Sequence, residues 1–238
     1  MVDSARSKAF DSISITEHIS QFAEPRNKLK FGSVHTKGRM FSHIEEYLLE
    51  FRKVPSKNPT VNKGLEVDYI RRFRQEIAEY VNERGWDILL LSVHELRDGL
   101  DVEDTSRSQD KESSERRWVQ YIELQKEGLQ SDFLPYNVLT HPVRLGRSSR
   151  VFPSNLDELL IELAEVARTE DRALELNGND LTRDYKLVEK LAQACSAGGC
   201  KVSFGSDAHD PSEVGRGYEK ALELVDRFGL EQLTLPQR

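Results

Sequence analysis

The feature that most constrains this chain is a regular alternation of short, β-rich apolar runs with stretches of helical periodicity. Each run ends on or near a His, Glu or Asp, and the six runs cover residues 12–18, 64–68, 88–94, 138–142, 174–177 and 202–209. Strands that alternate with helices predict a parallel sheet, either open or closed into a barrel. We therefore expect an α/β fold, whose last two strands cover residues 173–177 and 201–205.

Apolar spacing near 3.6 residues predicts the helices between these strands. They cover residues 2–9, 41–51, 70–81, 115–127, 157–168, 184–197 and 212–228. Ser42 is expected to cap the second of them. Residues 97–114 are charged and without periodicity, which predicts a long loop, either a functional lid or disordered. The 238 residues match the size of one barrel, commonly about 250 residues, so a single domain spanning residues 1–238 is expected.

Composition argues against several classes of protein. A net charge of -7 gives no electrostatic reason to expect nucleic-acid binding. The chain has no apolar run of about 18 residues, so no transmembrane helix and no membrane partner are expected. Its first residues lack the apolar core of a secretory signal. The two cysteines, Cys195 and Cys200, are expected to be free thiols in a cytoplasmic protein.

The polar residues that end the strands predict a metal site. Carboxyl ends of parallel strands share one edge, so these residues converge there. Four of the six His in the chain sit at strand ends, and imidazole nitrogen with carboxylate oxygen suits divalent transition metals. A carboxylate inside an apolar strand, such as Glu66, is costly unless it is paired or coordinates a metal. The candidate ligands are His18, Glu66, His94, His141, Asp207 and His209.

Plainer interpretations stand beside the metal site. A single His near a strand end is more often a hydrogen-bonded structural residue than a ligand, and the segment of Asp207 and His209 also has the composition of a capped turn. Recurrence at equivalent positions is what favours metal binding. Asp68 is interpreted as a solvated neighbour of Glu66. Glu175 is left open as a ligand, an orienting residue or a hydrogen-bond acceptor.

The remaining histidines and the arginines carry less information. His35 and His43 do not follow strands and are expected to be solvated. Arg144 and Arg147 follow His141 within one loop, and guanidinium forks suit phosphate. These two are candidate substrate-binding residues, although most surface arginines bind nothing. The chain lacks a Walker-type phosphate loop and a Gly-x-Ser-x-Gly motif, which argues against P-loop and serine-nucleophile chemistry.

Taken in order, the strand-end motifs resemble those of the PHP (polymerase and histidinol phosphatase) family. They read Thr-Glu-His (16–18), Gly-Leu-Glu-Val-Asp-Tyr (64–69), Ser-Val-His-Glu-Leu (92–96), Thr-His-Pro (140–142) and Gly-Ser-Asp-Ala-His-x-Pro-x-x-Val-Gly (205–215). The resemblance covers nearly all of the chain. The second and third motifs look most like the histidinol-phosphatase branch.

The resemblance implies a distorted (β/α)7 TIM-like barrel with up to three divalent ions, of zinc, manganese or iron, at its strand ends. By analogy, His18 and His209 would serve one ion. Glu66 would bridge two ions, and His94 with His141 would complete the second site.

A third ion would bind Asp207 together with a His-x-His pair on a strand that precedes Ser12 in the family. This sequence does not contain that pair. The resemblance therefore predicts an N-terminally truncated barrel without its first strand, and fewer ions than a complete member holds.

The implied activity is that of a metal-dependent phosphomonoester hydrolase, closest to the histidinol-phosphate phosphatase of histidine biosynthesis. Its substrate would be a small phosphorylated molecule, and Asp207 and His209 would be catalytic. Two alternatives stay open. The first is a phosphoesterase for another small phosphate or a nucleotide. The second is an inactive truncated relative that acts as a binding protein. The sequence does not indicate an oligomeric state.

Overall fold

The computed structural model describes residues 1–29, 40–55, 58–82, 84–105 and 110–235. Its strands form one sheet in which all neighbours pair in parallel and the spatial order follows the chain from β1 to β6. They are β1 (Ser12–His18), β2 (Thr60–Asp68), β3 (Ile88–Ser92), β4 (Val138–Leu139), β5 (Ala173–Asn177) and β6 (Lys201–Gly205). The expected parallel α/β fold is confirmed, and this strand order is that of a TIM-like barrel.

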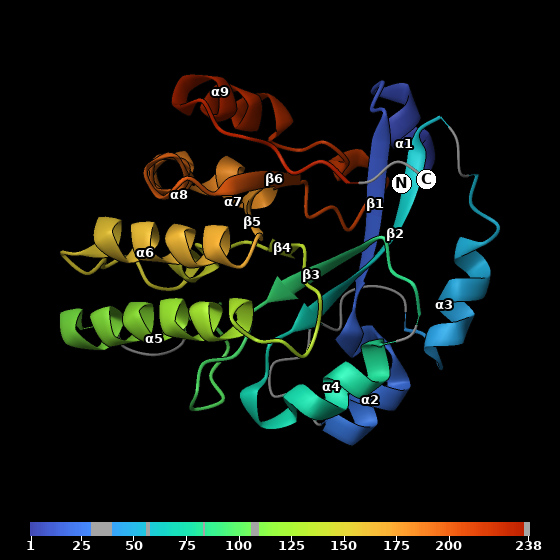
Figure 1. Cartoon of the computed structure of the whole chain (residues 1–238), viewed down its shortest axis with the longest axis horizontal. Coiled ribbons are helices and arrows are strands. Elements are labelled where there is room, and N and C mark those ends of the chain that lie inside the picture. Colours follow the sequence, from blue (N-terminus) through green and yellow to red (C-terminus); the bar gives the residue numbers. More distant parts are fainter. Residues whose placement is uncertain (30–39, 56–57, 83, 106–109, 236–238) are drawn as a thin grey trace.

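Helices connect the strands and cover one face of the sheet (Figure 1). Helices α5, α6, α8 and α9 stack beside one another, whereas α2 and α4 pack together near β1 and β2. The helices are α1 (Val2–Ser7), α2 (Ala23–Leu29), α3 (Ile44–Phe51), α4 (Arg74–Val81), α5 (Lys111–Leu129), α6 (Leu156–Thr169), α7 (Gly178–Arg183), α8 (Tyr185–Gly198) and α9 (Tyr218–Phe228). No described helix is long and apolar enough to cross a membrane.

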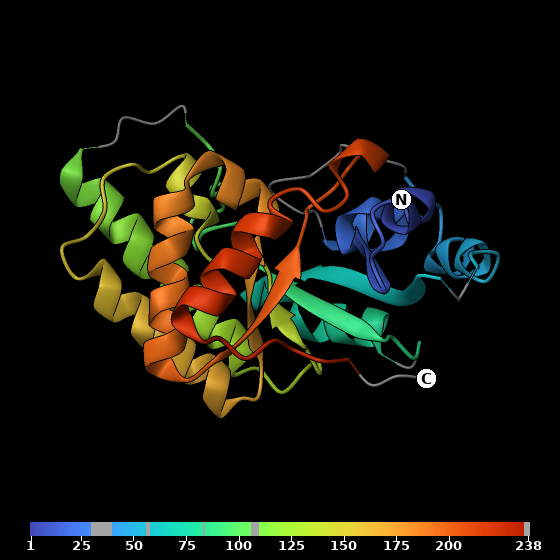
Figure 2. The same cartoon turned by 90° about the horizontal axis from the view of Figure 1, so that it is seen from above.

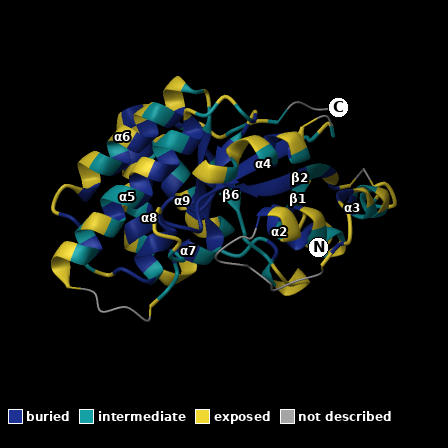
Figure 3. Ribbon diagram, turned by 90° about the horizontal axis from the view of Figure 1, so that it is seen from below, coloured by how far each residue is buried: buried dark blue, intermediate teal, exposed yellow. Residues whose placement is uncertain are grey.

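The two faces of the sheet differ because side chains alternate along a strand. In β2, Leu65 and Val67 belong to the main core that the helices cover, as the buried strands in Figure 3 show. Glu66 and Asp68 alternate with them and therefore lie on the opposite face, yet both are buried. The same face also carries a small apolar cluster, against which Leu233 and Leu235 of the C-terminal segment pack. Its members are Ile88, Leu90, Val138 and Ala173.

The sheet curls so that segments next to its first and last strands touch (Figure 2). Ser4 Oγ, in α1, donates a hydrogen bond of 2.5 Å to the carbonyl of Pro211. The Phe10 ring meets Tyr218 edge-on, with centroids 5.0 Å apart. Along the other side of β6, the Val202 amide donates to the carbonyl of Glu231 at 2.8 Å. The six strands thus form a curled half-barrel that brings its carboxyl ends together.

The predicted strands at 173–177 and 201–205 have the bounds that the structure gives them. The helix predicted over 212–228 is wrong in its first part. A short 3-10 turn, Pro211–Glu213, is followed by Gly215 and Gly217, both with φ +79. A left-handed backbone ends helical geometry and favours glycine, so α9 begins only at Tyr218.

Two further expectations are wrong at helix starts. His43, not Ser42, is the N-cap residue of α3, and the Ser42 amide instead donates to Glu46 Oε2 at 3.0 Å. Helix α7 was not expected at all. It starts directly after β5 because Asn177 Oδ1 accepts hydrogen bonds from the amides of Asn179 and Asp180, the usual function of an N-cap asparagine.

Candidate metal centre

Glu66 lies at the centre of a buried cluster of imidazole rings. Pairing of β1 with β2 places it in register with His18. Its Oε1 atom lies 3.1 Å from His141 Nε2, 3.5 Å from His94 Nε2 and 3.5 Å from His18 Nδ1. All four side chains are buried. Residues from four successive strand ends therefore converge on one carboxylate oxygen.

These contacts stabilise the charged form of Glu66. Burial by itself raises the pKa of the Glu66 carboxyl. The nearby imidazoles of His18, His141 and His94, with the hydrogen bond from His141, outweigh burial and hold the pKa of Glu66 well below its usual range. An ionised carboxylate is the form that binds a cation.

The spacing of these atoms fits a transition-metal ion. Two ligands of a tetrahedral ion with metal–nitrogen bonds of about 2.0 to 2.1 Å lie about 3.3 Å apart. The distances of 3.1 to 3.5 Å around Glu66 Oε1 match that value. In addition, the buried Nδ1 of His141 has no hydrogen-bond partner within the described parts of the chain. Glu66, His94 and His141 are thus a donor group that can hold a metal ion.

Asp68 is not a solvated neighbour, and that interpretation is wrong. It is buried at the end of β2, and its Oδ1 lies 2.5 Å from Nδ1 of His94. Burial lowers the pKa of His94, but the charge and hydrogen bond of Asp68 act against burial and raise the pKa to about 9. The sequence missed this contact because it joins two strands that are separated by a helix.

Glu175 is a hydrogen-bond acceptor that orients the segment of His141. Its Oε2 accepts from Thr140 Oγ1 at 2.5 Å, from the His141 amide at 2.9 Å and from Asn177 Nδ2 at 2.9 Å. Burial raises the pKa of Glu175 to about 7. His141 has φ +38, a left-handed conformation that needs such support. The Glu175 carboxylate therefore fixes where the His141 ring points.

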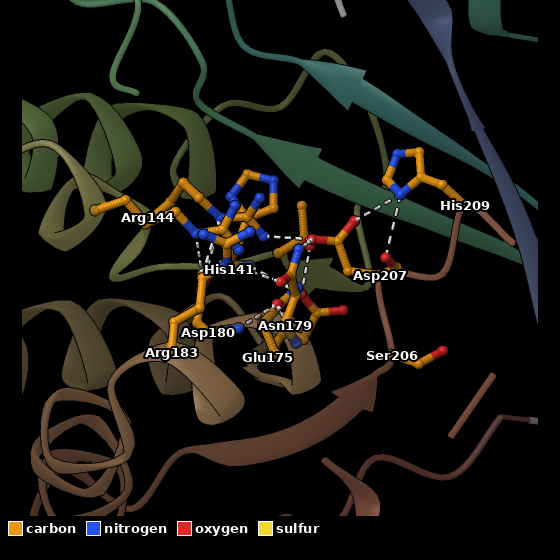
Figure 4. A network of polar contacts seen from close by, with 12 residues as sticks. His141, Arg144, Glu175, Asn179, Asp180, Arg183, Ser206, Asp207 and His209 are labelled. Carbon is orange, nitrogen blue, oxygen red and sulfur yellow. Dashed lines mark hydrogen bonds and ion pairs between the residues drawn. The ribbon is translucent and has the colours of Figure 1, made fainter. Parts of the chain in front are cut away.

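Arg144 reaches toward the carboxylates of Asp180 and Asp207 (Figure 4). It is only 4% exposed. Nη2 donates to Asp207 Oδ2 at 2.6 Å, Nε to Asp180 Oδ2 at 3.2 Å, and Nη1 to Glu103 Oε1 at 3.2 Å. Arg147 shares two of these acceptors, with Nε 2.8 Å from Asp180 Oδ1 and Nη1 3.3 Å from Glu103 Oε2. Arg144 thus contacts the candidate ligand Asp207 directly, and Arg147 joins the same network through Asp180 and Glu103.

The network shifts the titration of its carboxylates. Burial by itself raises the pKa of Glu103, but the positive charges of Arg144 and Arg147 outweigh it and lower the pKa to about 2. The Arg144 guanidinium in the same way holds the pKa of Asp207 well below its usual range despite burial. These groups are carboxylates at neutral pH.

Asp207 and His209 share the turn that follows β6. His209 Nδ1 lies 3.7 Å from Asp207 Oδ1, and the His209 side chain is 47% exposed. Its ring stacks over that of His18, with centroids 6.2 Å apart. The turn is held by Arg216, whose Nη2 donates to the carbonyl oxygens of Ser206 and Asp207 at 3.2 and 2.8 Å. Asp207 and His209 therefore lie at the mouth of the site.

The structure thus brings all six predicted ligands to one edge of the sheet. His43 lies apart and is exposed, with Nδ1 2.7 Å from Glu24 Oε1. His35 falls outside the described residues. No sequence pattern indicated the partners supplied by loops, Glu103 and Arg216. Asn177, a capping residue at a strand end with Asp180 three residues later, is a signal that could have revealed the helix after β5 that places Asp180, but this helix was not predicted.

These features define a class: an α/β protein with TIM-like strand order and a candidate metal centre at the carboxyl ends of its strands. No protein-family model matches the chain. Curated relatives are similar to it along most of its length. A "Probable histidinol-phosphatase" of Thermotoga maritima is 26% identical over 202 residues, which is 81% of this chain and 74% of the relative. A "Histidinol-phosphatase" of Bacillus subtilis is 26% identical over 93% of this chain and 90% of the relative.

A solved structure shares the fold. It is the crystal structure of histidinol phosphate phosphatase from Lactococcus lactis, complexed with zinc, L-histidinol and phosphate. The TM-score is 0.73 at 22% sequence identity, and the match covers 98% of this chain and 88% of that one. The likeness shows that the curled sheet described above is the fold of that phosphatase.

Proposed function

We propose that this chain is a metal-dependent phosphomonoesterase of the PHP family's histidinol-phosphatase branch, and that it hydrolyses histidinol phosphate in histidine biosynthesis. The observation that carries the proposal is the position of Glu66 Oε1, 3.1 to 3.5 Å from three imidazole nitrogens on three other strand ends. Relatives named histidinol-phosphatase along most of the chain support the substrate.

The residues proposed to hold divalent ions are His18, Glu66, His94, His141, Asp207 and His209. Zinc, manganese and iron fit this mixture of imidazole and carboxylate ligands. Bound divalent ions supply a nucleophilic water at neutral pH and neutralise charge that develops on phosphoryl oxygens. The burial of Glu66, His94 and His141 excludes bulk water from their side of the site, which strengthens their electrostatic interaction with a bound cation.

Asp207 and His209 are proposed as the catalytic pair. Arg216 holds their turn through two carbonyl oxygens, and the partly exposed His209 ring is accessible to a substrate that enters from solvent. Arg144 and Arg147 are proposed to bind the phosphate. The Arg144 guanidinium donates to Asp207, and that of Arg147 donates to the neighbouring Asp180. Planar guanidinium forks match phosphate oxygens in pairs. In the structure both forks are paired with carboxylates, which the substrate must replace.

The missing first strand, the single domain and the cellular location belong to the same proposal. The absence of the family's first strand, with its His-x-His pair, stays a prediction. Within the described residues β1 pairs with β2 alone, so the other edge of β1 is where such a strand would pair. One core cluster that extends from Ile19 to Leu230 supports a single domain over residues 1–238. The buried free thiols of Cys195 and Cys200 support a cytoplasmic location.

The test is phosphate release by the metal-loaded protein from histidinol phosphate, from a mononucleotide and from p-nitrophenyl phosphate. We expect kcat/KM for histidinol phosphate to exceed the others by about 100-fold or more, because recognition of polar substrate groups discriminates strongly. His94→Gln should remove the activity, whereas His43→Gln, an exposed histidine outside the cluster, should keep it.

Two outcomes would overturn the proposal. Faster turnover of another phosphoester would make the chain a phosphoesterase for a different small phosphate or a nucleotide. Absence of turnover on every substrate by protein that holds its metal would favour an inactive binding protein.

A further inference from the structure

We infer that Asp68 is a positioning residue of the metal centre: it fixes the His94 ring so that Nε2 is offered to the ion, and it is not itself a ligand. This inference rests on the proposed function only in that a metal ion binds beside Glu66.

The first step is the geometry of the His94 ring. Its Nδ1 lies 2.5 Å from Asp68 Oδ1, while its Nε2 lies 3.5 Å from Glu66 Oε1. An imidazole has two nitrogens, and the one that donates a proton to a carboxylate leaves the other with a free lone pair. Asp68 thereby selects the tautomer in which Nε2 faces Glu66. Carboxylates of this kind orient metal-binding histidines in many proteins.

The second step excludes Asp68 as a ligand. His18, Asp68 and His94 also form a group close enough to hold an ion, so this alternative needs an argument. Ligands of one tetrahedral ion lie about 3.3 Å apart. The distance of 2.5 Å between Asp68 Oδ1 and His94 Nδ1 is a hydrogen-bond distance and too short for that. Glu66, in contrast, keeps ligand-like distances to its three imidazoles.

The third step is the rigidity of the two side chains. Asp68 is the last residue of β2 and is in register with Ser92 of β3, and the amide that follows it, Tyr69, donates to the Ser92 carbonyl at 2.7 Å. The carbonyl of His94 accepts from the Val102 amide at 2.9 Å. Both backbones are therefore held, and both side chains are buried. The contact between them restricts rotation of the His94 ring.

The experiment measures metal affinity rather than activity. Zinc affinity of the full chain is measured by competition with a chromogenic chelator, and bound cobalt is followed by its visible spectrum. Asp68→Ala should weaken affinity by about 10- to 100-fold, the usual effect of losing such a partner, and should change the cobalt spectrum. The number of ions bound at saturation should stay the same.

Asp68→Asn provides the rescue. Its side-chain oxygen still accepts a hydrogen bond from His94 Nδ1, so its affinity should lie between wild type and Asp68→Ala. Glu95→Gln is the matched control, because Glu95 is the buried carboxylate next to His94 but contacts Arg72 at 2.7 Å instead. It should leave zinc affinity within about twofold of wild type, since it removes a similar charge from a carboxylate that pairs with Arg72.

Three results would overturn the inference: unchanged affinity in Asp68→Ala, a loss of bound ions at saturation in both Asp68 variants, or an equal loss in Glu95→Gln. The second result would make Asp68 a ligand. Failure of the proposed function is a separate outcome, in which wild-type protein binds metal and shows the Asp68 effect but does not hydrolyse histidinol phosphate. A wild-type protein that binds no metal would contradict both.

Discussion

At the scale of single residues, Glu66 decides whether the site is a metal centre or a set of ordinary buried contacts. Three imidazole nitrogens surround one of its oxygens. Glu66→Gln removes the negative charge and replaces one carboxylate oxygen by an amide nitrogen, which cannot bind a metal ion. We expect metal affinity to fall by more than about 100-fold, because even outer partners of ligands are worth 10- to 100-fold. Isothermal titration with zinc measures this.

Glu17→Gln is the control for that measurement. Glu17 lies one residue before His18 on β1, so its side chain points to the other face of the sheet. The affinity of the Glu17→Gln variant for zinc should equal that of wild type. Equal affinity in Glu66→Gln would contradict the assignment of Glu66 as a ligand.

At the scale of elements, the segment between β3 and α5 is tied to the site through Glu103. Arg144 donates from Nε, Nη1 and Nη2 to Asp180, Glu103 and Asp207. The Asp180 amide is anchored to Asn177 at the start of α7, and Asp207 is a candidate ligand. Glu103, with a side chain 29% exposed on a loop, is the carboxylate that a phosphate can most readily replace.

Glu103→Gln should therefore tighten the binding of inorganic phosphate to the metal-loaded protein. We expect about a tenfold lower dissociation constant, which corresponds to roughly 1.4 kcal/mol. Asp98→Asn removes an equal charge from the same loop, where Asp98 accepts from the Leu100 amide, and should have no effect. Phosphate binding that is unchanged or weaker in Glu103→Gln would show that Glu103 anchors the loop and does not compete with phosphate for Arg144.

Strand β6 approaches β5 so closely at Gly205 that a side chain has no room there. A Cβ atom on Gly205 would lie 1.8 Å from Glu175 Oε1. Gly205→Ala should displace Glu175 from the His141 segment and lower the free energy of unfolding by about 1 to 3 kcal/mol, as overpacking does. Thermal or urea unfolding measures it. Ser203→Ala, two residues earlier on the same face of β6, should change stability much less.

At the scale of the whole molecule, the sequence predicted the architecture and the set of candidate ligands, because both follow from periodic patterns. Strands β5 and β6 had their observed bounds, and residues that end parallel strands meet by geometry. What sequence could not supply is contact between distant loops and strands. The Asp68–His94 hydrogen bond and the Glu103–Arg144 ion pair span 26 and 41 residues.

Local backbone geometry was the other source of error. The turn at Gly215 and Gly217 was included in the predicted helix. Sequence alone does not reveal that both glycines have a positive φ, which ends helical geometry. Helix α7 was hidden because it is only six residues long, too short for a periodic signal. Its asparagine cap nevertheless positions Asp180 beside Arg144.

The central claim is that the buried cluster around Glu66 holds divalent metal, and metal content tests it most directly. The purified chain is stripped with chelator, reconstituted with zinc or manganese, dialysed and measured by elemental analysis together with Glu66→Gln. The account predicts about one equivalent or more in wild type, with the loss of metal in the variant. Less than about a tenth of an equivalent in reconstituted, folded wild-type protein would contradict it.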